Sequence, residues 1–209
     1  MSEELGNIER PLAEEFRPER KLFFVPLIFA SEELPAEFLE MVNRYWEQVQ
    51  AQVASLESKL GDVSRVYHEL IPPGDEEGSN ALGGVEELNT GSHSVVRTRV
   101  EKGAKLQSIE DGELLAEYVD WGNCLAAGLQ NQRVFDQVYS SYVAVQRRRE
   151  EHIAKRVDET LEKGGTGLLL MREGQGVQFP RDIRVFYIAP LALDEIRRWL
   201  RARQSEAET

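Results

Sequence analysis

Apolar side chains recur along the chain in two patterns, one typical of buried strands and the other typical of helices that bury a single face. Short, nearly uninterrupted apolar runs bounded by turn residues predict strands. Longer segments with apolar residues at steps of three or four predict helices. The predicted strands are 22–30, 63–71, 167–171 and 183–188. The predicted helices are 35–60, 113–130, 134–161 and 190–203, with short helices around 85–88 and 94–102.

The helix over 134–161 is the longest, and its apolar stripe contains one cation. The stripe comprises Val138, Tyr142, Val145, Ile153, Val157 and Leu161. Its largest gap, between Val145 and Ile153, is filled on the same face by Arg149. An unpaired buried charge costs several kcal/mol, so we expect Arg149 to find an anionic partner in the core.

The alternation of strands and helices predicts an α/β fold with a layered, open and largely parallel sheet. We expect a single domain over 22–203, with a helical insertion at about 75–130 lying over one edge of the sheet. Residues 1–21 are expected to form a flexible arm, and 204–209 a polar tail. Pro26 lacks a donor for the ladder, which predicts an edge strand or a bulge there.

Charge and composition narrow the classes of partner. Lys and Arg number 25 against 37 Asp and Glu, a formal net charge of −12, whereas proteins that bind nucleic acid or anionic membranes carry the opposite sign. No apolar run approaches the roughly 20 residues of a membrane span, and the acidic N-terminus lacks the pattern of a signal peptide. A lone cysteine, Cys124, set among apolar residues and expected to be packed, suits a reducing cytoplasm. We therefore expect a cytoplasmic protein that binds neither nucleic acid nor membrane.

Candidate chemistry lies where the strands end, because open parallel sheets bind ligands beyond the carboxyl ends of their strands. Glu69 comes late in one strand, and Glu173 and Gln175 follow another. A carboxylate at Glu69 could orient water, hold a cation, or pair with Arg149, and the residues leave the catalytic and the structural interpretation open. His68 is on the other face of the same strand, where a hydrogen-bonded core histidine is the commoner interpretation.

The pattern of metal-ligating residues is weak. Three scattered histidines and one cysteine show no zinc-site spacing, so no metal site is predicted. Mg²⁺ or Mn²⁺ held by Glu69 with the acids at 75–77 stays an open alternative. The Gly-Gln-Gly segment at 174–176 is not a phosphate loop, since neither a lysine nor a helix follows it. The sequence identifies no cofactor.

Three segments together resemble a known family. They are the strand ending Tyr67-His68-Glu69-Leu70, the helix segment 149–157 (Arg-Glu-Glu-His-Ile-Ala-Lys-Arg-Val), and the strand and loop 167–175 (Gly-Leu-Leu-Leu-Met-Arg-Glu-Gly-Gln). In this order they resemble the TraB/PrgY-like group, which is similar to ChaN-like and erythromycin-esterase-like proteins and includes hydrolases and putative peptidases. The resemblance implies that Glu69 is the group's strand-end acid and Arg149 its helix arginine. The loop histidine of the group is replaced here by Gln175, which has no titratable proton near pH 7.

Three functional hypotheses follow. The first is a hydrolase-like domain that has lost or changed its activity and binds a small ligand or a protein partner, with Arg149, Gln175, Glu173 and His68 as binding residues. The second is an active hydrolase of the peptidase or esterase class that uses Glu69. The third is a homo-oligomeric assembly protein, motivated by aromatic residues on the long helices such as Tyr45, Trp46, Tyr139 and Tyr142.

Overall fold

The structure is a computed structural model that describes residues 18–31, 33–72, 74, 79–174 and 176–207. Within them, five strands form one sheet in the order β3-β2-β4-β1-β5, and every pair of neighbouring strands is parallel. The predicted α/β class is confirmed. In chain order the elements are β1 (Arg20–Pro26), α1 (Ala36–Leu60), β2 (Arg65–His68), α2 (Ser79–Leu88), α3 (Thr90–Glu101), β3 (Lys105–Gln107), α4 (Gly112–Ala126), α5 (Gln132–Thr160), β4 (Thr166–Met171), β5 (Ile183–Tyr187) and α6 (Leu191–Ala207).

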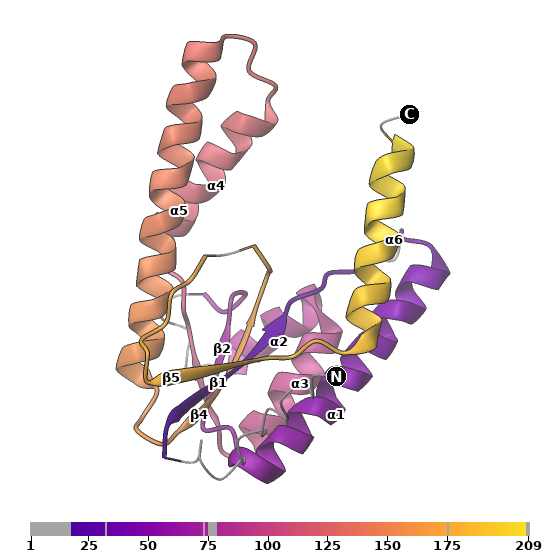
Figure 1. The fold of residues 1–209 in the computed structure, drawn as a ribbon, viewed down its shortest axis with the longest axis vertical. Coiled ribbons are helices and arrows are strands. Elements are labelled where there is room, and N and C mark those ends of the chain that lie inside the picture. The colour runs from indigo at the N-terminus through magenta and orange to yellow at the C-terminus, as the bar shows by residue number, and fades with distance from the viewer. Residues whose placement is uncertain (1–17, 32, 73, 75–78, 175, 208–209) are drawn as a thin grey trace, which may run out of the picture.

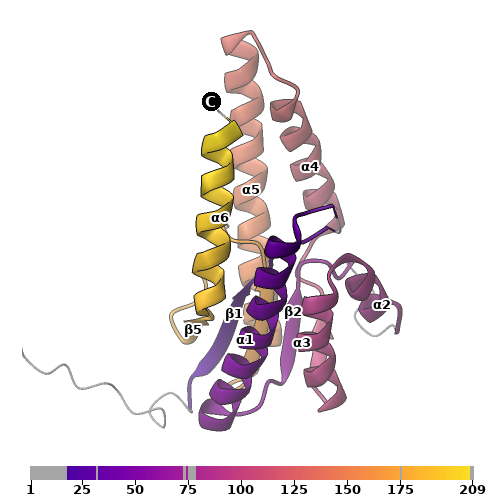
Figure 2. The same ribbon diagram turned by 90° about the vertical axis from the view of Figure 1, so that its right-hand side faces the viewer.

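Helices cover both faces of the sheet (Figures 1 and 2). One face packs against α1, α3 and α6 through the larger apolar cluster, which includes Val49, Val66, Val96 and Ile196. The other face packs against α5 through a smaller cluster around Tyr67, Ile153, Val157 and Leu169. Alternate residues of β2 therefore serve opposite faces, as the strand period of two predicts.

The helices α4 and α5 form a hairpin that extends well beyond the sheet (Figure 1). The base of α5 buries Ile153 and Val157 against the sheet, and Val138 and Val145 are buried higher on the helix, whereas none of the described side chains of α4 is buried. Arg149 is buried on the same helix, which confirms the inward orientation predicted for it. The lone cysteine, Cys124, is exposed on α4 rather than packed, because this helix lies outside the core.

The strand order creates a switch point at the carboxyl ends of β1 and β4. After β1 the chain moves through α1 to β2 and then to the edge strand β3, all on one side of β1. It then returns through α4 and α5 to β4, which pairs with β1, and crosses to β5 on the far side. Connections from β1 and β4 thus run in opposite directions, and open α/β sheets bind ligands outside such a point.

Several boundaries differ from the sequence prediction for local reasons. Pro26 lies in a central strand with no bulge; β1 simply ends at this residue, and its carbonyl accepts a hydrogen bond from Tyr45. The predicted insertion contains the edge strand β3, which was missed because only Leu106 of its three residues is buried. At the ends, β1 already begins at Arg20, which pairs with Asp158 and Asp182, and α6 continues through most of the predicted tail. Residues 1–17 of the predicted arm lie outside the described residues.

In the described part of the chain, every helix is too short or too polar to cross a bilayer.

Candidate functional site

The carboxyl edge of the sheet gathers three glutamates, and each is paired with an arginine. Glu110 follows β3 and pairs with Arg149 of α5. Glu69 follows β2 and pairs with Arg172, which follows β4. Glu173 also follows β4 and pairs with Arg197 of α6. We call these the strand-end pairs.

The pair Arg149–Glu110 is buried and bidentate. Arg149 Nε donates to Glu110 Oε2 at 2.8 Å, and Arg149 Nη2 donates to Glu110 Oε1. Both side chains are fully buried, and the ring of Tyr118 lies 5.2 Å from the guanidinium carbon. Burial opposes the charge of Arg149, but hydrogen bonding to Glu110 and the fields of Glu110 and Glu69 raise its pKa above the ordinary value. The expected inward cation thus has a different partner from Glu69, the one suggested by the sequence.

The pair Glu69–Arg172 is asymmetric. Arg172 donates twice to this carboxylate, from its backbone N–H to Oε2 at 2.8 Å and from Nε to Oε1 at 2.7 Å. The Glu69 side chain is 2 % exposed, whereas that of Arg172 is 54 % exposed. The acid is therefore covered, and the guanidinium is the part of this pair that solvent reaches.

The third pair joins β4, β5 and α6 at the other side of the switch point. Glu173 accepts hydrogen bonds from the hydroxyl of Tyr187 and from Arg197, whose Nε lies 3.2 Å from Glu173 Oε2. Partial burial and the contact with Glu173 raise the pKa of Tyr187. Glu173, predicted as a binding residue, is thus engaged within the chain.

Two tyrosines complete the polar environment between the hairpin and the strand ends. The hydroxyls of Tyr118 and Tyr142 lie 2.7 Å apart, and their rings stack at 5.0 Å between centroids. Hydrogen bonding to Tyr118 is the main cause that raises the pKa of Tyr142 to about 12, while the nearby charges of Arg149 and Arg172 act in the opposite direction. The hydroxyl of Tyr142 therefore stays protonated near neutral pH.

His68 lies on the opposite face of β2 from Glu69. Its Nδ1 accepts from the backbone N–H of Leu70 at 3.1 Å, which leaves Nε2 to donate to Ser92 Oγ at 3.1 Å. Burial lowers the pKa of His68 to about 3, so the ring is neutral. This is a hydrogen-bonded core histidine directed at α3, and it does not join the strand-end pairs.

Two other predicted groups lie outside the described residues, namely Gln175 and the acids at 75–77. Among the side chains that the structure does describe, no three His, Cys, Asp or Glu residues gather as a metal-binding group. Glu110, Arg172 and Arg197 were not predicted as site residues, although an acid immediately before the helix-capping Asp111 was visible in the sequence. The strand order that brings these residues to one edge of the sheet cannot be recognised from the sequence pattern.

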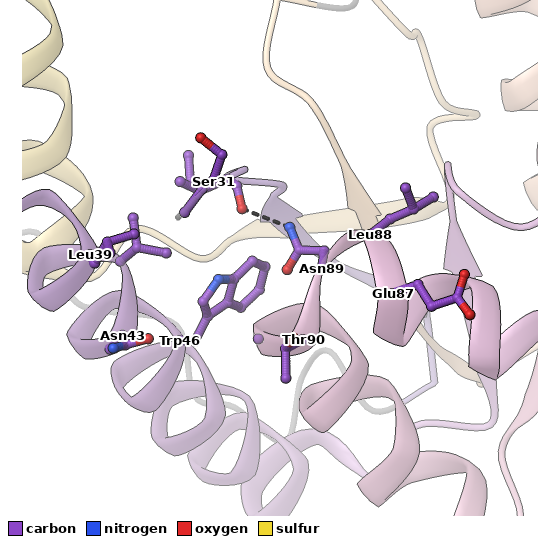
Figure 3. A pocket seen from close by; sticks show the side chains of 12 residues that line it. Ser31, Leu39, Asn43, Trp46, Glu87, Leu88, Asn89 and Thr90 are labelled. Atoms are coloured by element: carbon purple, nitrogen blue, oxygen red, sulfur yellow. Dashed lines mark hydrogen bonds between the residues drawn. The ribbon is translucent and has the colours of Figure 1, made fainter. Parts of the chain in front are cut away.

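A cavity of about 560 Å³ lies at the carboxyl end of β1, on the face covered by α1 and α3 (Figure 3). The indole of Trp46 and the amides of Asn43 and Asn89 line it, and its one charged lining residue among those described is Glu87. Asn89 is fixed, since its amide donates to Ile28 O at 2.7 Å and accepts from Ser92 N at 2.9 Å. Gly91 is required beside Trp46, because a Cβ there would lie 2.1 Å from the indole. This cavity suits a neutral or cationic ring more than an anion.

In comparisons with known proteins, no family model, curated protein or solved structure matches the chain.

Proposed function

We propose that this protein is a hydrolase-like domain that binds a small anionic ligand at the strand-end pairs and has lost acid–base catalysis. The observation that carries the proposal is that all three strand-end glutamates accept hydrogen bonds from arginines. A general base must offer a carboxylate oxygen to the proton that it removes. Here the guanidinium groups occupy those oxygens, so the carboxylates hold arginines in place.

The exposed chemistry of the site favours an anion. Glu69 and Glu110 are covered, whereas Arg172 is more than half exposed and the tyrosine pair lies close by. Arginine held in a fixed orientation by one carboxylate can use its remaining N–H groups to bind a carboxylate or phosphate of a ligand. The acidic net charge of the rest of the chain does not remove this local preference, since charges beyond about 10 Å are largely screened at 0.1 M salt.

A thermal-shift and calorimetry panel tests the proposal with phosphate, acetate, citrate and nucleoside monophosphates. We expect at least one anion to raise the Tm of the wild-type protein and this shift to disappear in Arg172→Ala. The matched control is Arg97→Ala, which removes an equally exposed arginine paired with Glu101 on α3. No shift with any of the anions, or an equal shift in Arg172→Ala, overturns the proposal. A shift lost only when Ser31→Phe fills the cavity beside Trp46 moves the ligand there and also overturns it.

An active hydrolase using Glu69 is the second candidate, favoured by the exposure of Arg172. A substrate that displaced this arginine would free the Glu69 carboxylate at the end of β2. Assays with peptide and ester substrates decide between the two. Turnover by the wild type that Glu69→Gln abolishes would establish the hydrolase and refute the loss of catalysis.

A further inference from the structure

The cavity beside Trp46 continues into a second cavity, and the proposed function uses neither. The second has a volume of about 450 Å³ and shares four lining residues with the first, namely Asn43, Trp46, Thr90 and Gly91. The two cavities therefore form one groove between α1 and α3, and Trp46 lines both of its halves. We call it the Trp46 groove. Each half has the size of a small-molecule site, for which roughly 300–1,000 Å³ is typical.

Trp46 places an unused hydrogen-bond donor in this groove. The residue is 7 % exposed, and no described residue accepts a hydrogen bond from its Nε1. Figure 3 shows the indole standing between α1 and α3. Its nitrogen edge faces α3, since a Cβ on Gly91 would lie 2.4 Å from Nε1. A nearly buried indole N–H normally has a partner, so this one indicates an acceptor that comes from outside the chain.

The first turn of α3 adds further donors beside the indole. Asn89 caps this helix, because its side chain accepts from Ser92 N at 2.9 Å and its carbonyl accepts from His93 N at 3.0 Å. The N–H groups of Thr90 and Gly91 have no acceptor within the helix, as is usual at a helix start, and both residues line the groove. Donors thus come from two elements, and a ligand oxygen with free lone pairs is their complement.

The charges of the groove restrict the kind of oxygen that fits. Among the described residues, its charged lining consists of two acids, Glu87 in one half and Glu47 in the other, and no lysine or arginine lines it. A carboxylate or phosphate would be repelled by these acids and would leave water without a counter-charge. A carbonyl oxygen of an uncharged group meets neither obstacle. The ligand acceptor is therefore a neutral carbonyl.

The walls of the groove indicate the rest of the ligand. Ile28, Leu39 and Val42 supply apolar surface. Asn43 is exposed and has no hydrogen-bond partner among the described residues, so its amide can both donate and accept. A cyclic amide matches these features together, because it carries a carbonyl and an N–H side by side on a ring that packs against apolar side chains.

We propose that the Trp46 groove binds a neutral cyclic amide of the size of a nucleobase, as the free base or its nucleoside. The carbonyl accepts hydrogen bonds from Trp46 Nε1 and from the first turn of α3, and the ring N–H donates to the amide of Asn43. Gly91 keeps the first turn of α3 close to the indole, since a Cβ there would lie 2.1 Å from the ring. The groove uses none of the strand-end pairs, so this proposal stands or falls separately from the proposed anion binding.

Isothermal titration calorimetry of the full-length chain with uracil, cytosine, hypoxanthine and uridine tests the proposal. We expect saturable binding of at least one compound with a Kd of about 1 mM or tighter. Trp46→Phe keeps an aromatic ring and removes the N–H, so it should weaken binding about tenfold. The matched control is Trp199→Phe on α6, where the indole packs against Phe38 outside the groove, and it should bind as the wild type does. No saturable binding of any of the four compounds overturns the proposal, as does wild-type affinity in Trp46→Phe.

A second variant and two further compounds test the ligand class without altering the buried indole. Asn43→Leu changes an exposed position and removes the amide, so it should weaken binding of uracil about fivefold or more. Dimethyluracil keeps the carbonyls but lacks a ring N–H, and it should bind the wild type more weakly than uracil by a similar factor. Benzylammonium, a cationic ring without a carbonyl, should also bind more weakly than uracil. Wild-type affinity in Asn43→Leu, or tighter binding of benzylammonium than of uracil, overturns the proposal.

Discussion

Within its described residues, the protein contains two buried arginine–glutamate pairs of the same chemistry at opposite ends of one sheet. Arg99 of α3 pairs with Glu57 of α1 at 2.9 Å, close to the amino ends of β2 and β3 where both helices finish. Arg149 pairs with Glu110 at the carboxyl ends. All four side chains are buried, so burial and charge alone do not distinguish a structural pair from one that belongs to a site.

Their surroundings do distinguish them. Arg99 also donates to Gln50 at 2.6 Å and to the carbonyl of Val95, and it lies within the larger apolar cluster. Arg149 lies against Tyr118 and close enough to Glu69 for that carboxylate to raise its pKa. The amino-end pair joins the helices α1 and α3, and both of its side chains are buried. The carboxyl-end pair lies near Glu69, which holds a second arginine, Arg172, that solvent reaches, and this is what makes one pair part of a candidate site.

The largest expected effect comes from removing either cation. Arg99→Leu and Arg149→Leu should each lower the free energy of unfolding by about 3–5 kcal/mol, because each leaves a glutamate buried without its partner. Urea unfolding followed by circular dichroism measures both. Equal stability loss, with anion binding lost only in Arg149→Leu, would support the contrast between the two ends.

Replacing both Arg149 and Glu110 separates the contribution of this pair to stability from its contribution to anion binding. Arg149→Met combined with Glu110→Leu should recover most of the lost stability, since an apolar pair of similar volume avoids the cost of buried charge. If the pair serves only stability, this double variant should bind anions as the wild type does. We expect binding to stay impaired.

An intermediate effect on stability is expected from the protonation of His68, which lies on the face of the sheet that α3 covers. Its pKa is lowered to about 3 in the folded chain by burial, against about 6.5 when unfolded. Below about pH 6.5 the unfolded chain therefore binds a proton that the folded chain does not, and stability falls as the pH drops from 6.5 toward 3. The loss should reach about 2 kcal/mol at pH 5. In His68→Asn the midpoint of urea unfolding should change less between pH 7 and pH 5 than in the wild type. An equal change in the two proteins would refute the assignment of this pH dependence to His68.

The smallest effect is expected for Glu69→Gln. The amide oxygen can still accept the backbone N–H of Arg172, and the exposed guanidinium loses only a partner on one side. The free energy of unfolding should fall by about 1 kcal/mol or less. A loss comparable with that of Arg149→Leu would show that the Glu69 pair, too, is mainly structural.

How far the sequence predicts the molecule depends on the range of the interaction. The long helices and buried strands follow from periodicity, which is local, and so does the inward orientation of Arg149. The identity of Arg149's partner does not follow from periodicity. Glu110 comes after a three-residue strand with one buried side chain, and only the strand order brings it to the site. Arg99 was missed for a similar reason: α3 lies in a glycine-containing region with a weak apolar pattern. Two strand-end acids, Glu69 and Glu173, were identified because strand ends are visible in the pattern.

The length of α5 gives its hairpin the mechanics of a lever. From Gln132 to Arg149 the helix rises about 1.5 Å per residue, or roughly 26 Å in all, above the point where the Arg149–Glu110 pair anchors it. A small tilt of α5 about the Arg149–Glu110 pair therefore displaces the tip of the hairpin by a much larger distance than it displaces the base. Whatever touches the end of the hairpin is therefore mechanically connected to the two charges at its base.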